Sequence, residues 1–314
     1  MKIRKSLIII LAASGFTGAN LFAAAAGVDG AKIDQITGLK GKLNEKEGVY
    51  KVSLPRDDVK VTVAGWQMPP FMGLGTWAAF QGTNDKAMMM GDTVLFEDEV
   101  NPVMSAALDN GLSVTALHNH FFFDEPKVYF MHIGGEGSVE KLAGAVRKVY
   151  DTIKTIRGPN AQPGSTFGQR ALEKSPLPAK SSITPAALNE IFAMQGDAKD
   201  GMLKFTIGKK STMGGMPIGK EIGVNTWAAF AGTDDNAIVD GDFAVTEDEL
   251  QPALKTLRQA GINIVAIHSH MTHENPRILF LHYWGRGSAK DLANAVKGAL
   301  LVTGLSGVTT TVSN

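Results

Sequence analysis

The stretch GTWAAFQGTNDKAMMMGD, residues 75–92, returns 150 positions later as NTWAAFAGTDDNAIVDGD, residues 225–242. Residues 76–80 and 88–96 of the first copy are rich in aromatic, β-branched and other apolar residues, with turn-forming residues between them. Such runs are typical of two short strands joined by a turn. The chain therefore contains two copies of one strand-bearing unit, and this duplication organises the rest of the sequence.

The repeat extends well beyond this stretch. Between Gly73 and Ser138, 26 of 66 positions are identical to the residue found 150 positions later. Residues 157–183 are rich in Pro, Gly and Ser and lack hydrophobic periodicity, which is typical of a linker. We therefore expect a first repeat domain at residues 31–156, a linker at 157–183 and a second repeat domain at 184–314.

Each copy is expected to contain both strands and helices. In the first copy, strand signals cover residues 49–54, 59–63, 76–80 and 88–96, followed by a helix that ends at Gly111. Two further strands and a closing amphipathic helix come after it, and in the second copy Thr246 and Glu249 have the spacing of a capping box. This order predicts an α+β fold in which an antiparallel sheet carries helices on one face, with a ferredoxin-like arrangement as a candidate.

The N-terminus and the composition limit the classes of function. Lys2, Arg4 and Lys5 precede an apolar run that ends in small residues, so residues 1–26 are expected to be a signal peptide rather than a membrane anchor. The chain has no cysteine, which excludes disulfides and thiolate metal ligands, and its 31 basic residues equal its 31 acidic ones. We therefore expect a periplasmic or secreted protein that binds no nucleic acid and keeps no membrane anchor after cleavage.

All seven histidines lie in two matching stretches, residues 115–135 and 265–285. Both stretches follow the pattern H-x-H-x3-[D/E]-x-P-x5-H, and the three shared histidines come from two strands joined by a hairpin. Residues two apart on a strand point to the same face, and one of the two registers places His132 opposite Ala116 on that face. The residues of the pattern are His118, His120, Asp124 and His132 in the first copy, and His268, His270, Glu274 and His282 in the second.

Three imidazoles and a carboxylate are a ligand set for a divalent transition metal, with zinc favoured and iron, manganese or copper as alternatives. Asp124 and Glu274 would then serve as a further ligand or as a general base. The alternative interpretation is a structural cluster in which the histidines bond to backbone carbonyls. His273 faces a phenylalanine in the other copy and is expected to be peripheral.

Two other repeated residue types are site candidates. Trp77 and Trp227 are expected to fill a core. Asp92 and Asp242 each follow a glycine, and the sequence leaves open whether they are turn residues or acids that orient an imidazole.

The residues TWAAF, EDEVNPV, VTALHNH and EPKVYFMHIGG resemble a bacterial exported family of unknown function that is named after the lipoproteins LppY and LpqO. The resemblance covers nearly all of both copies and implies export, but it implies no reaction. The histidine pattern favours a metal-binding protein, with hydrolysis of a small molecule or of a cell-envelope glycan or peptide as its candidate activity. The alternative function is a non-catalytic binding module with a structural histidine cluster.

Overall fold

The computed structural model describes residues 27–158, 162–163 and 176–304. Residues 27–158 are called the first half below, and residues 176–304 the second half. The expected signal peptide, residues 1–26, lies outside the described residues. None of the helices in the described ranges combines the length and the apolar character that crossing a bilayer requires.

The two halves contain the same elements in the same order. Those of the first half are α1 (Gly30–Thr37), β1 (Lys42–Asn44), β2 (Val49–Pro55), β3 (Thr62–Val63), β4 (Trp66–Gln67), η1 (Pro70–Met72), β5 (Gly75–Gly82), β6 (Ala87–Phe96), α2 (Val100–Asp109), β7 (Ser113–His118), β8 (Asp124–Glu125), β9 (Val128–Gly137) and α3 (Val139–Arg157). Those of the second half are α5 (Pro185–Phe192), β10 (Asp197–Lys199), β11 (Met202–Gly208), β12 (Ser211–Met213), β13 (Met216–Ile218), η3 (Lys220–Ile222), β14 (Asn225–Gly232), β15 (Ala237–Thr246), α6 (Glu247–Gln259), β16 (Asn263–His268), β17 (Glu274–Asn275), β18 (Ile278–Gly287) and α7 (Ala289–Val302).

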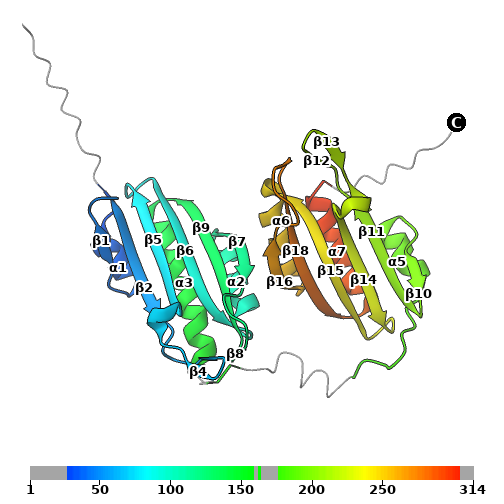
Figure 1. Cartoon of the computed structure of the whole chain (residues 1–314), viewed down its shortest axis with the longest axis horizontal. Coiled ribbons are helices and arrows are strands. Elements are labelled where there is room, and N and C mark those ends of the chain that lie inside the picture. Colours follow the sequence, from blue (N-terminus) through cyan, green and yellow to red (C-terminus); the bar gives the residue numbers. More distant parts are fainter. Residues whose placement is uncertain (1–26, 159–161, 164–175, 305–314) are drawn as a thin grey trace, which may run out of the picture.

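A single antiparallel sheet runs through both halves in the order β1-β2-β5-β6-β9-β7-β16-β18-β15-β14-β11-β10. The order of the second six strands mirrors that of the first six, so the halves meet at β7 and β16. Figure 1 shows the long helices of each half behind its strands. The predicted α+β class, with helices on one face of an antiparallel sheet, is confirmed.

The ferredoxin-like element of this architecture is limited to part of each half. Strands β6 and β7 flank β9 and are connected through α2, which is the split β-α-β arrangement. The place next to β6 that a strand after α3 would take in a ferredoxin-like fold is occupied by β5, which precedes β6 in the chain. Each half is thus a split β-α-β unit extended by a meander of strands from its N-terminal side.

Burial on one face explains why these residues form this sheet. Along β5 the even-numbered residues Thr76, Ala78 and Phe80 are buried, while Trp77 and Ala79 between them are only half-buried. The buried set packs against helices such as α3, whose apolar side chains recur at helical spacing. One core cluster contains buried residues from both halves. The other sheet face, called the open face below, is free to carry polar groups.

The open face is covered at one end of each half. The small sheet β4-β3-β8 lies over Val94, Phe96, Val128 and Phe130 in the first half. The sheet β13-β12-β17 has the same place in the second half, over a cluster that includes Phe280. Beyond these covers the open face carries exposed and half-buried side chains, such as Met90 and Trp77, together with the buried Asp242.

Several local predictions are confirmed and others change. The helix predicted around 97–111 begins only at Val100 in the first half, whereas in the second half it begins at Glu247 with the predicted Thr246–Glu249 capping box. The strand predicted at 59–63 is reduced to β3, and α1 was not predicted. Ser182, within the expected linker, pairs with Thr233 of the second half.

The junction between the halves is held by a symmetric pair of side-chain amides. Asn101 accepts a hydrogen bond from the Ile264 N–H at 2.8 Å and donates to the Ile264 carbonyl at 3.2 Å. Gln251, its counterpart 150 residues later, makes the same two bonds to Val114, both at 2.8 Å. Each half thus satisfies the backbone of the other half at the point where β7 meets β16.

This arrangement predicts that Asn101→Ala and Gln251→Ala each lower the free energy of unfolding by roughly 1–2 kcal/mol, because a part-buried backbone pair loses its partner. Urea denaturation of the full chain measures this, with the exposed Gln35→Ala as the control. Two variants as stable as the control would show that water replaces the amides at no cost.

Candidate metal centre

The candidate centre is a row of residues that face one another across the open face. In the second half, Trp227 lies opposite Asp242, Asp242 opposite His282, and His282 opposite Ala266. In the first half, the same row contains Trp77, Asp92, His132 and Ala116. Residues directly opposite on neighbouring strands share a face. The register that the sequence left open is therefore the one that gathers the histidines.

The three histidines of each half have nearly the same spacing. The His268 ring centroid lies 5.1 Å from that of His270 and 5.0 Å from that of His282. In the first half, His118 lies 5.1 Å from both His120 and His132. The outer ring of each half stacks on a buried phenylalanine, His270 on Phe280 at 3.5 Å and His120 on Phe130 at 3.4 Å.

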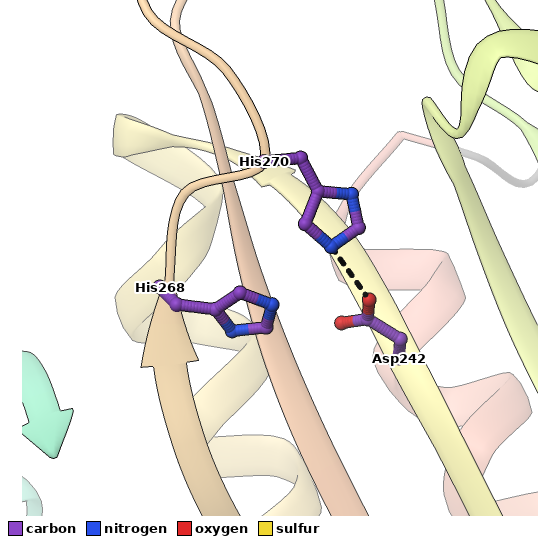
Figure 2. Close-up of side chains that lie close together, drawn as sticks. All are labelled: Asp242, His268 and His270. Atoms are coloured by element: carbon purple, nitrogen blue, oxygen red, sulfur yellow. Dashed lines mark ion pairs between the residues drawn. The ribbon is translucent and has the colours of Figure 1, made fainter.

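In the second half a carboxylate completes the cluster. One ligand atom each from Asp242, His268 and His270 lies within 4.8 Å of the others, and Nε2 of His270 is 3.3 Å from Oδ2 of Asp242. Figure 2 shows both imidazole rings turned toward this carboxylate. Ligand atoms around a tetrahedral zinc ion, with bonds of about 2.0–2.1 Å, lie about 3.3 Å apart. The Asp242–His270 separation already matches that spacing.

A fourth group faces the same carboxylate oxygen. Nε2 of His282 lies 4.0 Å from Oδ2 of Asp242. The other ring nitrogens of His270 and His282 contact backbone carbonyls, Nδ1 of His270 at Gly223 (3.3 Å) and Nδ1 of His282 at Gly241 (3.2 Å). Since a carbonyl only accepts, these two contacts are hydrogen bonds in the tautomer with the proton on Nδ1, and in that tautomer the Nε2 lone pair of each ring faces Asp242.

This tautomer has an electrostatic consequence. A neutral imidazole with its proton on Nδ1 presents the lone pair of Nε2 to a negative oxygen, which is repulsive. Either a second proton on each ring or one cation between the rings and the carboxylate removes the repulsion. A backbone carbonyl that fixes Nδ1–H and leaves Nε2 free is also the usual second contact of a histidine bound to a metal.

Two buried polar atoms of the group have no hydrogen-bond partner among the described residues. They are Oδ1 of Asp242, whose residue is 3% exposed, and Nδ1 of His268. A buried polar atom without a partner destabilises the fold, so such atoms call for a water or an ion. The donor set of one carboxylate and three imidazoles fits a divalent transition metal.

Burial favours the neutral form of one imidazole in each half, His268 and His120. It is the main cause that lowers the pKa of His268 below 6.5, with added repulsion from His282 and His270 and partial opposition from Asp242. Burial likewise lowers the pKa of His120 in the first half, where the neighbouring histidines add to the effect. The neutral imidazole is the form that binds metals.

The first half repeats the imidazoles without the tight carboxylate. Asp92 lies opposite His132 in the register, and its Oδ1 is also buried without a partner among the described residues. Within those residues, however, only the second half brings an acid and two histidines within 4.8 Å. The first half therefore offers three imidazoles on one face and a half-buried acid beside them.

The acids of the sequence motif lie elsewhere. Asp124 accepts a hydrogen bond from the Val128 N–H at 2.7 Å and pairs with Lys127 at 3.1 Å. Glu274 accepts from the Ile278 N–H at 3.1 Å and does not belong to the group around His268. Both carboxylates stabilise the turn of their own hairpin. The acid that lies beside the imidazoles of the second half is Asp242, not Glu274.

The structure also places the other repeated residues. Asp92 and Asp242 lie within long strands, not in turns, and the Gly-Asp pair repeated inside both predicted strands was the signal for them. The expectation that Trp77 and Trp227 fill a core is wrong, since both are half-buried on the open face. His273 is exposed, as expected of a peripheral residue.

A family model described as Domain of Unknown Function (DUF1259) matches residues 31–152 and 186–302. This protein belongs to the DUF1259 family. The two matched segments are consistent with tandem copies, and each DUF1259 segment contains one row of the open face with its histidines.

Other comparisons add little to the family assignment. No curated protein matches the chain. Among solved structures, the crystal structure of a trimeric bacterial microcompartment shell protein PduB is similar at 12% identity, covering 83% of this chain and 89% of that chain. Its TM-score of 0.21 is too low to support an argument about this DUF1259 protein.

The lowered pKa of His268 predicts a pH effect on stability. Below pH 6.5 the unfolded chain takes up a proton on this imidazole before the folded chain does, so acidification favours unfolding. In metal-free protein the His268 ring should titrate with a midpoint below 6.5, measured by proton NMR and assigned with His268→Gln. A midpoint at or above 6.5 would contradict the burial of this ring.

Proposed function

We propose that the second half binds one divalent transition metal through Asp242, His268, His270 and His282, with zinc as the favoured ion. The observation that supports this most directly is the pair of Nε2 atoms turned toward one carboxylate oxygen, with both Nδ1 atoms at carbonyls. A cation satisfies all of these groups at once. Two protonated rings side by side would instead repel each other.

The first half is proposed to bind a second ion more weakly. Its histidines have the same spacing, but Asp92 is not part of a tight ligand group. Loss of one anionic ligand lowers the affinity for a dication and leaves more positions to water. The chain would then carry one strong and one weak centre, both on the open face.

The catalytic part of the proposal is metal-assisted hydrolysis. The side chains of His270 and His282 are 34% and 41% exposed, so an ion at this place is in contact with solvent. An ion held closely by Asp242, His268 and His270, with Nε2 of His282 at the longer distance of 4.0 Å from the carboxylate, would leave a coordination position for a water and acidify it toward a nucleophile near neutral pH. In an exported protein the substrates would be small molecules or glycans and peptides of the cell envelope.

Metal analysis tests the binding proposal. Full-length protein purified without chelators and given zinc should hold one tightly bound equivalent and a second one that dialysis removes. Asp242→Asn and His268→Gln should weaken the tight site by more than the roughly 10- to 100-fold that loss of an outer contact costs. His273→Asn is the matched control, because it removes an exposed histidine of the same loop and asparagine tolerates the positive φ of 68°.

Zinc that binds equally well to the parent and to Asp242→Asn would contradict the ligand assignment. Parent protein that binds neither zinc, cobalt, iron, manganese nor copper would favour the non-catalytic binding module with a structural histidine cluster.

Hydrolysis is tested separately on the loaded protein. We expect the loaded protein to hydrolyse 4-nitrophenyl acetate or 4-nitrophenyl phosphate. Turnover should fall at least about tenfold in Asp242→Asn, because this variant loses the ion that activates the water. His273→Asn should retain the parent rate. Turnover that persists in metal-free protein would rule out a metal-bound nucleophile.

A further inference from the structure

The open face of the first half differs from that of the second half in the row next to the histidines. In the first half this row runs Lys51, Ala79, Met90 and Gly134. In the second half it runs Lys204, Ala229, Asp240 and Trp284. The first two residues of the two rows therefore match. In the second half Asp240 takes the place of Met90, and Trp284 takes the place of Gly134.

Lys51 supplies a positive charge at one end of the row. Its Nζ lies over the Trp77 ring, 4.0 Å from the centroid, and no carboxylate pairs with it among the described residues. A cation–π contact orients the ammonium group without neutralising its charge. Lys204 lies over Trp227 in the same way, at 4.3 Å, but its row contains the exposed Asp240.

Apolar side chains form the floor between Lys51 and the histidines. Met90 is 58% exposed and Met88, two residues away on the same face, is 50% exposed. Large apolar side chains exposed beside polar groups mark binding surfaces, and methionine adapts to varied apolar ligands. Gly134 carries no side chain where the second half has Trp284, so the floor of the first half stays open.

The floor leads directly to the imidazoles. Gly134 follows His132 by two residues on β9, so both lie on the open face, and His118 and His120 adjoin His132. From β2, which carries Lys51, to β9 there are three strand spacings, or about 14 Å. This is the length of a medium alkyl chain.

We infer that the first half binds an organic anion with an apolar body, such as a medium-chain carboxylate, with the anionic group at Lys51 and the chain along Met90 toward His132. Charge complementarity selects the anion at the Lys51 end, since Lys51 is the charged residue of this row; the exposed acid Glu136 lies outside the row, opposite Met88. The methionine floor selects the apolar body. Binding of the anion does not depend on the proposed metal. Only a reaction of the bound ligand at the histidines would rest on the proposed function.

Calorimetric titration of the full chain with decanoate tests the inference. A chelator is present, so that binding is measured without metal and does not depend on the proposed centre. We expect Lys51→Gln and Met90→Asp each to weaken binding about tenfold, since each removes or offsets one charge-assisted contact. Gly134→Trp should block the floor, and Lys204→Gln, the matched control in the second half, should bind like the parent.

The variants are chosen so that folding does not decide the result. Met90→Asp and Gly134→Trp introduce the residues that the second half carries at the matching positions, and a Cβ at Gly134 meets nothing closer than 3.5 Å. Decyltrimethylammonium, which has the same chain with a positive head, should not bind. Binding of both amphiphiles alike, or equal losses in Lys51→Gln and Lys204→Gln, would overturn the inference.

Failure of this test and failure of the metal proposal can be told apart. Decanoate that binds metal-free protein with the predicted variant pattern supports the anion site whether or not zinc binds. Zinc binding without any decanoate binding rejects the anion site and leaves the metal centre in place.

Discussion

One-sided burial of the sheet is the constraint on which the rest of this structure depends. Helices cover one face, so every second residue of a long strand such as β15 is fixed in the core and the others face away from it. A slip of one residue would bury Asp242 under the helices and expose Val239 and Gly241. The core therefore sets the register, and the register places an acid, an imidazole and an indole side by side on the open face.

The parts of the fold that could be predicted are those that follow from this periodicity. The long strands, the closing helix and the capping box at Thr246 were readable because each depends on local spacing. The histidines could be assigned to one face as soon as one of two registers was chosen. The role of Asp242 is harder to predict from the sequence, because this residue lies 26 positions before His268. Its strand, β15, is separated from the strand of His268 by β18, and Glu274 lies nearer to His268 in sequence. The half-exposed position of the tryptophans does not follow from the sequence, because an indole between alanines has the same pattern whether its face is covered or open.

The junction between the halves was not readable for a different reason. Asn101 and Gln251 are different amino acids at matching positions, so they do not stand out among the identities of the repeat. Their shared role is visible only in space, where each satisfies one N–H and one carbonyl of the opposite half. Such reciprocal contacts have the symmetry of a two-fold dimer interface. The two halves are joined as identical subunits would be, although they lie in one chain.

The same symmetry explains how the halves can share a geometry and differ in chemistry. The imidazole spacing depends on backbone register and on a phenylalanine under the outer ring, and both are the same in each half. The neighbouring row is subject to no such constraint, because its side chains point to solvent. Met90 can therefore stand where Asp240 stands in the second half, and Gly134 where Trp284 stands, without any change in the core. A duplicated sheet of this kind holds its histidines fixed while the surface beside them changes, which gives one chain two related sites with different surroundings.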